Sequence, residues 1–363
     1  MWQPRKSTRQ IKVGDVKVGG DAPVSVQSMT NTPTEDINAT VAQIERLTAA
    51  GCEIVRVAVP DRAAAKAIGP IKKRITIPLI ADIHFDHRLA ITAAEAGVDG
   101  LRINPGNIGS KERIQKVAAA AHAERLPIRI GVNAGSLEKR LLEKFGGATP
   151  EAMVQSALDQ IRLLEDLGFD AIKVSLKASD VYRTVAAYRQ LSEITDVPLH
   201  IGVTEAGGLY PGIVKSSLGI GMLLAEGIGD TLRVSLTRDP VEEVRVGFEI
   251  LKALGLRQKG PEIISCPTCG RCNIDLFHIT ETVEKALLTV DTPITVAIMG
   301  CVVNGPGEAK EADIGITGGD GVGILFRKGK LVKKFPQEQL VEVLLAEVDK
   351  QVQTAKTENQ SQE

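Results

Sequence analysis

Residues 78–106 read "PLIADIHFDHRLAITAAEAGVDGLRINPG", and this stretch decides the fold. An apolar run at 78–84 is followed by the helical segment "RLAITAAEAG", which ends in Gly97, a typical helix C-cap residue. A second apolar run follows at 100–106. A strand, a helix and another strand in this order indicate a βαβ unit with two parallel strands.

The same unit is repeated through most of the chain. Strand-like runs lie at 25–30, 54–59, 78–84, 100–106, 128–133, 171–177, 199–205 and 231–237, with helical segments between them. Eight strands that alternate strictly with helices predict an α/β fold, a (β/α)₈ TIM barrel over residues 1–260, rather than an open doubly wound sheet. The opening "QIKVGDVKVGG" predicts a short hairpin on the barrel floor.

The pattern changes after residue 260. The segment 261–352 combines a cysteine-containing loop, two helical stretches and strands joined by Gly-rich turns, which predicts a small α+β domain. The tail 353–363 has one Ala as its only apolar residue, so we expect it to be disordered.

Composition and charge narrow the function classes. Apolar residues make up 43% and aromatic residues 3%, so the core is aliphatic. The net charge of −1 gives no reason to expect nucleic-acid or membrane binding. With no apolar run of membrane-spanning length and no signal peptide, we expect a cytoplasmic protein, in which clustered thiols are metal ligands or redox groups.

The predicted strands carry polar side chains toward their C-terminal halves, mostly two residues apart and therefore on one face. Active sites of barrels lie at the C-terminal mouth, so these side chains predict a site there. The alternative is a set of ion pairs between strands and helices. The residues are Arg56, Asp82, His84, Arg102, Asn104, Arg129, Asn133, Lys173, Ser175, His200, Thr204, Glu205, Arg233, Ser235 and Thr237.

Cations outnumber anions in this set. Five Arg and Lys residues against Asp82 and Glu205 favour a small, strongly anionic ligand such as a phosphate or diphosphate. Asp82 and Glu205 are candidates for proton transfer or hydroxyl binding. The run "ADIHFDH" (81–87) leaves open a metal site, but it has no partner His elsewhere, and we interpret His84 and His87 as loop or packing residues.

Four of the five cysteines lie near the C-terminal end of the sequence. "CPTCGRC" (266–272) and Cys301 fit zinc or iron, and no second cysteine pair completes a zinc ribbon. Spacing alone favours Cys266, Cys269, Cys272 and Cys301 as [4Fe–4S] ligands. Glu308, after the Gly-Pro-Gly turn of "CVVNGPGE", is a competing ligand.

At this point the chain resembles the 4-hydroxy-3-methylbut-2-en-1-yl diphosphate synthase family over nearly its whole length. The matching motifs are "SVQSMTNT", "ADIHFD", "LRINPGN", "KVSLKAS", "GVTEAG", "CPTCGR" and "CVVNGPGE". The resemblance implies one [4Fe–4S] cluster per chain, held by Cys266, Cys269, Cys301 and Glu308. Cys272 occupies a position that the family pattern does not require.

The resemblance also implies the reaction, the two-electron reductive opening of 2-C-methyl-D-erythritol 2,4-cyclodiphosphate. Reduced flavodoxin or ferredoxin would supply the electrons, and a head-to-tail homodimer would cap each barrel with the partner's small domain. Asp82, Glu205 and Glu308 would be catalytic. The implied substrate contacts are Arg56, Arg102, Asn104, Arg129, Asn133, Lys173, Thr204, Arg233, Ser235 and Asn304.

Two other functions compete with this one. The first is a non-redox barrel enzyme that acts on a phosphorylated or pterin-like substrate and has a structural zinc knuckle. The second is a non-enzymatic electron-transfer module. Neither accounts for the cysteines, "CVVNGPGE" and the barrel arginines together.

Overall fold

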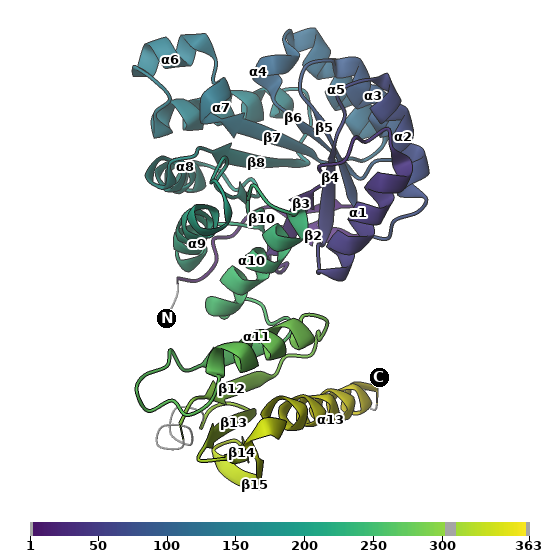
Figure 1. Cartoon of the computed structure of the whole chain (residues 1–363). Helices are drawn as coiled ribbons and strands as arrows, with labels where there is room; N and C mark the ends of the chain where they lie inside the picture. The colour runs from purple at the N-terminus through teal and green to yellow at the C-terminus, as the bar shows by residue number, and fades with distance from the viewer. Residues whose placement is uncertain (1–2, 302–309, 361–363) are drawn as a thin grey trace. The chain divides into compact units, whose positions relative to one another are not determined.

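The chain divides into two compact units, residues 1–257 and 258–363 (Figure 1). The computed structural model describes residues 3–301 and 310–360. The division lies close to the boundary expected at residue 260. Among the described residues, no helix combines the length and apolar character that a membrane crossing needs.

The first unit is a barrel of eight parallel strands. Its sheet has the order β8-β7-β6-β5-β4-β3-β10-β9, and a bridge between Val174 and Leu199 brings the two ends together, so the barrel is nearly closed. This confirms the predicted fold class. The strands are β3 (Ser25–Met29), β4 (Ile54–Ala58), β5 (Leu79–Ile83), β6 (Gly100–Ile103), β7 (Ile128–Asn133), β8 (Ile172–Lys177), β9 (His200–Ile201) and β10 (Thr231–Leu232).

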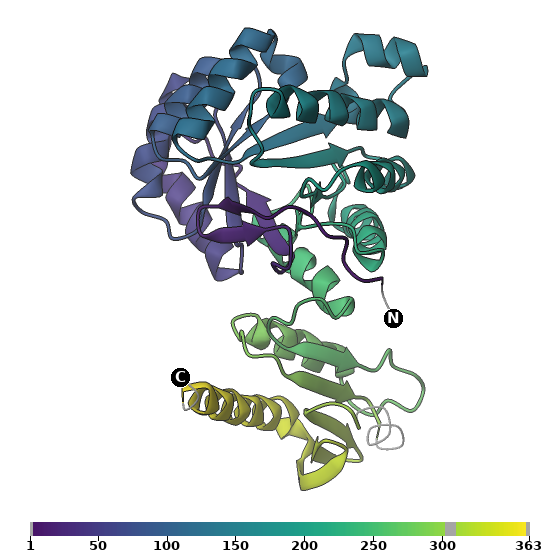
Figure 2. The ribbon, with the colours of Figure 1, turned by 180° about the vertical axis from the view of Figure 1, so that it is seen from behind.

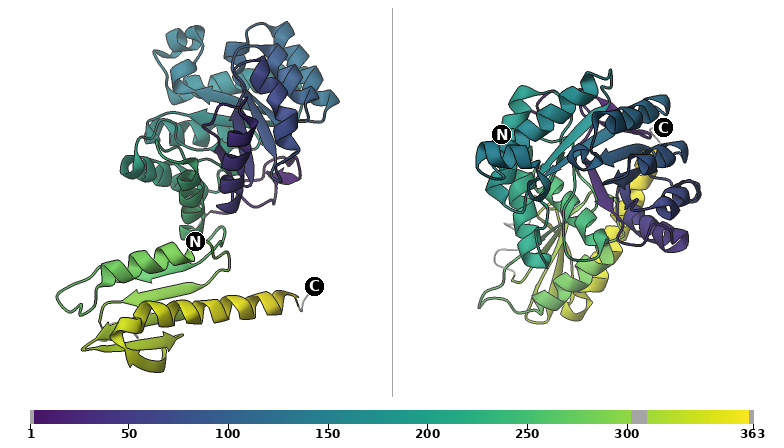
Figure 3. Two further views of the ribbon diagram at one scale, coloured as in Figure 1. Left: turned by 45° about the vertical axis from the view of Figure 1, so that its right-hand side comes forward. Right: turned by 90° about the horizontal axis from the view of Figure 1, so that it is seen from above.

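Helices surround this sheet, as the view from above in Figure 3 shows. Several begin at a residue whose side chain accepts a hydrogen bond from the first helical turn, for example Asp61, Asp180 and Thr149. Their apolar faces pack on the strands in one aliphatic core. The helices are α1 (Ile37–Ala49), α2 (Arg62–Lys72), α3 (His87–Glu95), α4 (Pro105–Ile108), α5 (Lys111–Ala123), α6 (Lys139–Phe145), α7 (Pro150–Glu165), α8 (Val181–Ile194), α9 (Leu209–Ala225) and α10 (Pro240–Ala253).

The last two barrel strands are shorter than the expected runs 199–205 and 231–237. The chain leaves the sheet at Gly202, whose φ is +158°. A Cβ at this position would lie 2.3 Å from the carbonyl oxygen of Arg233, so the two backbones approach more closely than a side chain allows. Thr204 and Glu205 therefore belong to a loop at the mouth rather than to a strand.

The barrel floor is covered by the N-terminal hairpin, as predicted. Strands β1 (Ile11–Val13) and β2 (Val16–Val18) pair antiparallel. Their side chains form a small cluster with Ile54 and Ile80, which lie near the starts of barrel strands. Figure 2 shows the hairpin across this end of the barrel.

The second unit is a five-stranded sheet in sequence order, parallel from β11 to β13 and antiparallel from β13 to β15. Helices α11 (Leu276–Leu287) and α13 (Leu340–Gln360) contribute to one core with β12 and β13 (Figure 3). The strands are β11 (Glu262–Ser265), β12 (Thr295–Met299), β13 (Ile314–Gly319), β14 (Val322–Arg327) and β15 (Lys330–Pro336).

Helix α13 forms the C-terminal part of the described chain. Helix α13 continues through residues 353–360. Leu340, Leu344 and Val348 anchor the helix in the core. Extending an existing helix costs much less than nucleating one, which favours continuation of α13 beyond its anchored part.

Candidate active site

Four charged side chains lie in one row across neighbouring barrel strands. The strand register pairs Asp82 with Arg102, Arg102 with Arg129, and Arg129 with Lys173. All four are buried, while the apolar residues that alternate with them belong to the core shared with the helices. The row therefore occupies the barrel interior, in the phase predicted from the sequence.

Asp82 is the anion of this row. Arg102 Nη1 donates a hydrogen bond to Asp82 Oδ1 at 2.9 Å, and Arg56 Nε lies 3.5 Å from Oδ2. Burial alone would raise the pKa of Asp82. The positive charge of Arg56, a hydrogen bond with His84 and the charge of Arg102 outweigh burial and hold this pKa well below its usual range. Asp82 therefore stays ionised at neutral pH and fixes two guanidinium groups.

The other cations of the row lack partners for several of their N–H groups. Arg129 Nη1 donates to Ser175 Oγ at 2.6 Å. Arg129 Nε and Nη2, Arg102 Nε and Lys173 Nζ are buried without a hydrogen-bond partner within the described parts of the chain. Unpaired buried charges cost several kcal/mol, and an anion at this place would supply acceptors for all of these groups.

Crowding of like charges shifts the ionisation of these groups. Burial, together with the charges of Arg129 and Arg56, lowers the pKa of Lys173 to about 7. Burial also lowers the pKa of Arg56 to about 10, although Asp82 opposes this shift. Arg56 thus remains charged at neutral pH, whereas Lys173 is close to its titration point.

A glycine makes room for one of the guanidinium groups. Gly131 lies on β7, two residues after Arg129. A Cβ on Gly131 would stand 2.5 Å from Arg102 Nε and 2.7 Å from Arg102 Nη2. The guanidinium of Arg102 therefore lies directly over the backbone of β7.

Arg233 is held from outside the sheet. Glu243 of α10 accepts hydrogen bonds from Arg233 Nε at 3.2 Å, from the Ser28 hydroxyl at 3.1 Å and from the Leu236 N–H at 3.1 Å. Arg233 thus forms an ion pair with a helix, which is the alternative that the sequence analysis gave to a site at the barrel mouth. Met29 Sδ lies between Arg233 and Arg56, 3.6 Å and 3.0 Å from their nearest Nη atoms.

Two site residues, His84 and Lys177, were given another role or missed in the sequence analysis, and His200, predicted on its strand, lies beside Lys177. His84 Nε2 lies 2.7 Å from Arg102 Nη1, so this histidine belongs to the edge of the row. Lys177 and His200 are buried, with Lys177 Nζ 3.2 Å from His200 Nε2. The sequence contained this information. His84 follows Asp82 by two residues and Lys177 follows Lys173 by four, so each lies on the same face of the chain as an inward-facing strand residue.

The remaining predicted residues lie at or just beyond the C-terminal ends of the strands. Asn104 is buried and donates to Ser136 Oγ at 3.1 Å, and Asn133, Thr204 and Ser235 are half-buried. Glu205 is exposed and has a φ of +52°, which is uncommon for a residue other than glycine and is found at functional sites.

The run "ADIHFDH" does not form a metal site in the described structure. Asp86 caps α3 and binds the guanidinium of Arg88, while Asp82 binds Arg102. In residues 3–301 and 310–360, no three His, Cys, Asp or Glu side chains are grouped to hold a single metal ion.

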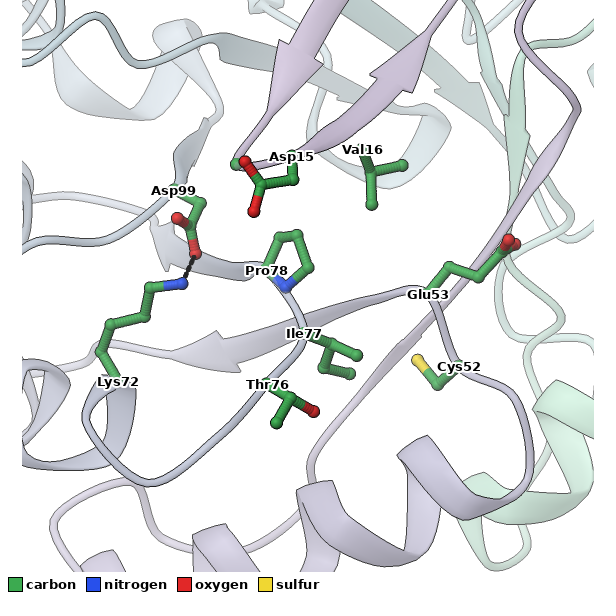
Figure 4. Close-up of a pocket in the computed structure, with 10 residues that line it drawn as sticks. Asp15, Val16, Cys52, Glu53, Lys72, Thr76, Ile77, Pro78 and Asp99 are labelled. Atoms are coloured by element: carbon green, nitrogen blue, oxygen red, sulfur yellow. Dashed lines mark ion pairs between the residues drawn. The ribbon is translucent and has the colours of Figure 1, made fainter. Parts of the chain in front are cut away.

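A hollow of about 340 Å³ lies at the other end of the barrel, between the floor hairpin and the starts of β4, β5 and β6. Figure 4 shows its ion pair between Lys72 and Asp99, and Asp99 also accepts a hydrogen bond from the Leu79 N–H at 2.7 Å. Cys52 is buried beside it, and burial raises the pKa of its thiol to about 12. Cys52 is thus an inert packing residue, as expected.

Two cysteines of the second unit lie at the ends of neighbouring strands. Cys266 directly follows β11 and Cys301 lies two residues after β12, and these strands are parallel neighbours. Arg271 lies beside them. A hydrogen bond with Cys269 and the charges of Cys269, Cys301 and Cys266 raise the pKa of Arg271. Donors of this type fit an iron–sulfur or zinc centre.

Cys272 donates a hydrogen bond from its thiol to the carbonyl oxygen of Ile274 at 3.3 Å. Both Cys266 and Cys272 pack against the core of the second unit. A Cβ on Gly300 would lie 2.7 Å from Cys272 Sγ. The two other predicted residues of this region, Asn304 and Glu308, lie outside the described residues.

Comparison with known proteins covers both units. The GcpE TIM-barrel domain model matches residues 8–248 and the GcpE protein C-terminal domain model matches residues 262–350. A dihydropteroate synthase structure from Yersinia pestis covers 69% of this chain and 100% of that chain, with a TM-score of 0.48 and 12% identity, a similarity too low to support a conclusion.

Curated relatives are much more similar. The 4-hydroxy-3-methylbut-2-en-1-yl diphosphate synthase (flavodoxin) of Geobacter sulfurreducens is 64% identical over 346 residues, 95% of this chain and 98% of that protein. The protein of the same name from Caldanaerobacter subterraneus is 59% identical over 352 residues, 97% of this chain and 99% of that protein. The chain therefore belongs to the GcpE family of 4-hydroxy-3-methylbut-2-en-1-yl diphosphate synthases (flavodoxin).

Proposed function

We propose that the chain catalyses the reductive ring opening of 2-C-methyl-D-erythritol 2,4-cyclodiphosphate to (E)-4-hydroxy-3-methylbut-2-enyl diphosphate. The bond from C2 to the phosphate oxygen breaks, the C3 hydroxyl leaves as water, and a C2–C3 double bond forms. Two electrons and two protons enter for each water released. The observation that carries this proposal is the row of buried, partly unpartnered cations in the barrel.

The cations bind the diphosphate. Arg102, Arg129 and Lys173 donate hydrogen bonds from their free N–H groups to the diphosphate oxygens. Arg56 and Arg233, beside the row, add positive charge around the diphosphate. Lys177 joins them from the end of β8. The ring and its hydroxyls are contacted by the polar groups at the strand ends, namely Asn104, Asn133, Thr204, Ser235 and Asn304.

The two barrel carboxylates have different tasks. Asp82 holds Arg56 and Arg102 in place, because its pKa is too low for it to carry a proton at neutral pH. Glu205 forms no ion pair within the described residues and stands at the mouth in a left-handed backbone conformation. Glu205 is therefore the group that delivers a proton to the leaving hydroxyl.

The family carries an iron–sulfur cofactor, and we assign it one [4Fe–4S] cluster held by Cys266, Cys269, Cys301 and Glu308. Cys266, Cys269 and Cys301 interact electrostatically with Arg271, whereas the Cys272 thiol donates to the Ile274 carbonyl oxygen, and this supports the set over four cysteines. The cluster, when bound, supplies the two electrons one at a time. The names of the relatives favour flavodoxin over ferredoxin as the donor.

The substrate cations and the cysteines lie in different units, so the site needs both. We assign this to a head-to-tail homodimer in which one protomer's second unit covers its partner's barrel. Helix α9 supports self-association, because Tyr210, Val214, Leu218 and Met222 form one apolar stripe with exposed fractions of 80, 56, 51 and 42%.

The test combines metal analysis with turnover on anaerobically purified protein. About four iron and four sulfide per chain are expected, with formation of the linear diphosphate when reduced flavodoxin is supplied. Glu308→Ala is expected to lose most turnover while the fold is retained. Zinc without sulfide, together with no product, would establish the non-redox alternative instead.

A further inference from the structure

One segment of the second unit carries a dense positive charge. Five of the eight residues in 327–334 ("RKGKLVKK") are Lys or Arg and none is acidic. Elsewhere in residues 258–363 the acidic residues outnumber the basic ones. We call Arg327, Lys328, Lys330, Lys333 and Lys334 the basic strip.

The basic strip is exposed and mostly free of ion pairs. It covers the end of β14 and most of β15, the outermost strand of the sheet (Figure 1). Arg327 pairs with Glu347, and Lys333 Nζ lies 5.7 Å from the centre of the Phe335 ring. In the part of the chain that the structure describes, Lys328, Lys330 and Lys334 form no ion pair.

Edge strands often carry lysines that prevent pairing with other chains, and this role alone explains some of the charge. It does not explain the apolar residues in the same strand. Leu331 and Val332 lie between the lysines and are 59% and 46% exposed. An apolar centre surrounded by charged groups is the usual composition of a protein-binding surface.

The strand register relates the basic strip to the cysteine end of β12. Lys334 pairs with Ile324, Ile324 with Thr317, and Thr317 with Met299. Met299 is the last residue of β12, two before Cys301. Three strand spacings amount to about 14 Å, so a protein seated on β15 lies close to the cysteines of the same unit.

We propose that the basic strip is the docking surface for the electron donor, a reduced flavodoxin-type protein that presents acidic groups around its flavin. This inference rests on the proposed function, since only a redox enzyme without its own flavin needs such a partner. Charge complementarity accelerates encounter with an acidic partner, and the apolar pair Leu331 and Val332 supplies the contact once the proteins meet.

The test reverses two charges on the strip. Lys330→Glu/Lys334→Glu leaves charged side chains on β15. The edge strand is therefore still protected from pairing with other chains and the unit still folds, but its attraction to an acidic protein is lost. The matched control is Lys111→Glu/Lys116→Glu on α5, two exposed lysines of the barrel unit, which changes the net charge equally. Flavodoxin binding is measured directly, and turnover is measured with reduced flavodoxin and separately with reduced methyl viologen.

The strip variant is expected to bind flavodoxin at least about tenfold more weakly at low salt, with a difference that shrinks at high salt. Its viologen-driven turnover and its iron content should equal those of the native chain. Equal flavodoxin affinity in the strip and control variants would overturn the docking proposal. Absence of viologen-driven turnover in the native chain would instead overturn the proposed function, and the binding measurement would still decide the docking surface.

Discussion

Gly131 determines where the Arg102 guanidinium can lie. In Gly131→Ala the new Cβ would stand 2.5 Å from Arg102 Nε, so the guanidinium must move out of the row. Misplacing a binding group by about 1 Å can cost about 100-fold in rate, and we expect a loss of that order in kcat/KM.

Steady-state kinetics with a thermal melt check this prediction. The control is Gly69→Ala inside α2, where the nearest atom to a new Cβ is a carbonyl oxygen at 3.5 Å, an ordinary contact. Native kcat/KM in Gly131→Ala would show that Arg102 is not needed in its observed position.

Lys173 makes substrate binding depend on pH near neutrality. Its pKa in the free protein is about 7, and a bound diphosphate stabilises the charged form. Below pH 7 the lysine is already charged and affinity is full. Above pH 7 it must first take up a proton, so affinity should fall as the pH rises, by up to about tenfold per pH unit.

Calorimetry of substrate binding in buffers of different ionisation enthalpy measures this proton uptake, which should be visible near pH 8. In Lys173→Met the uptake and the pH dependence should disappear, whereas Lys111→Met on the surface should leave both intact. Unchanged uptake in Lys173→Met would assign the proton to another group, such as Lys177 or His200.

At the scale of elements, the end of β12 and the cysteine loop fit together through one contact. Gly300→Ala would place a Cβ 2.7 Å from Cys272 Sγ and push the loop away from β12. We therefore expect Gly300→Ala to retain less iron per chain than the native protein. The double variant Cys272→Ala/Gly300→Ala removes the clash and should recover the iron.

Iron and sulfide analysis with the visible spectrum measures this effect, and the single variant Cys272→Ser is the reference. Retention of about four iron in Cys272→Ser would agree with a packing role. Loss of iron in that variant would make Cys272 a ligand and exclude Glu308 from the set.

The alternation of strands and helices made the barrel predictable, because each βαβ unit is a local pattern. The inward phase of Arg56, Asp82 and Arg102 was predictable for the same reason. Glu243 gave no such signal, since it lies on a helix and meets Arg233 only after the barrel closes. The early end of β9 at Gly202 depends on the approach of another strand, which no local pattern records.

At the scale of the whole molecule, the proposed homodimer predicts complementation between two inactive variants. Arg102→Met should disable the barrel, and Cys301→Ser should disable the proposed cluster site. In a head-to-tail dimer a mixed pair contains one intact barrel capped by one intact second unit. Random mixing should therefore restore about one quarter of native activity, because half of the dimers are mixed and each has one working site.

Turnover is measured after the two variants are mixed, dissociated and reassociated, and it is compared with each variant alone. Activity no greater than the sum of the separate variants would show that each chain caps its own barrel. Leu218→Asp on α9 provides an independent check, since it should shift the protein toward monomers in light scattering and prevent the complementation.

Because the positive charge inside the barrel is only partly compensated, binding of the anionic substrate should increase the stability of the folded protein. Arg129 and Lys173 leave the folded state with electrostatic energy that an anion releases. A ligand that binds only the folded chain at 100 times its Kd adds about 2.7 kcal/mol to the free energy of unfolding. We therefore expect the folded chain to resist proteolysis better when the cyclic diphosphate is bound.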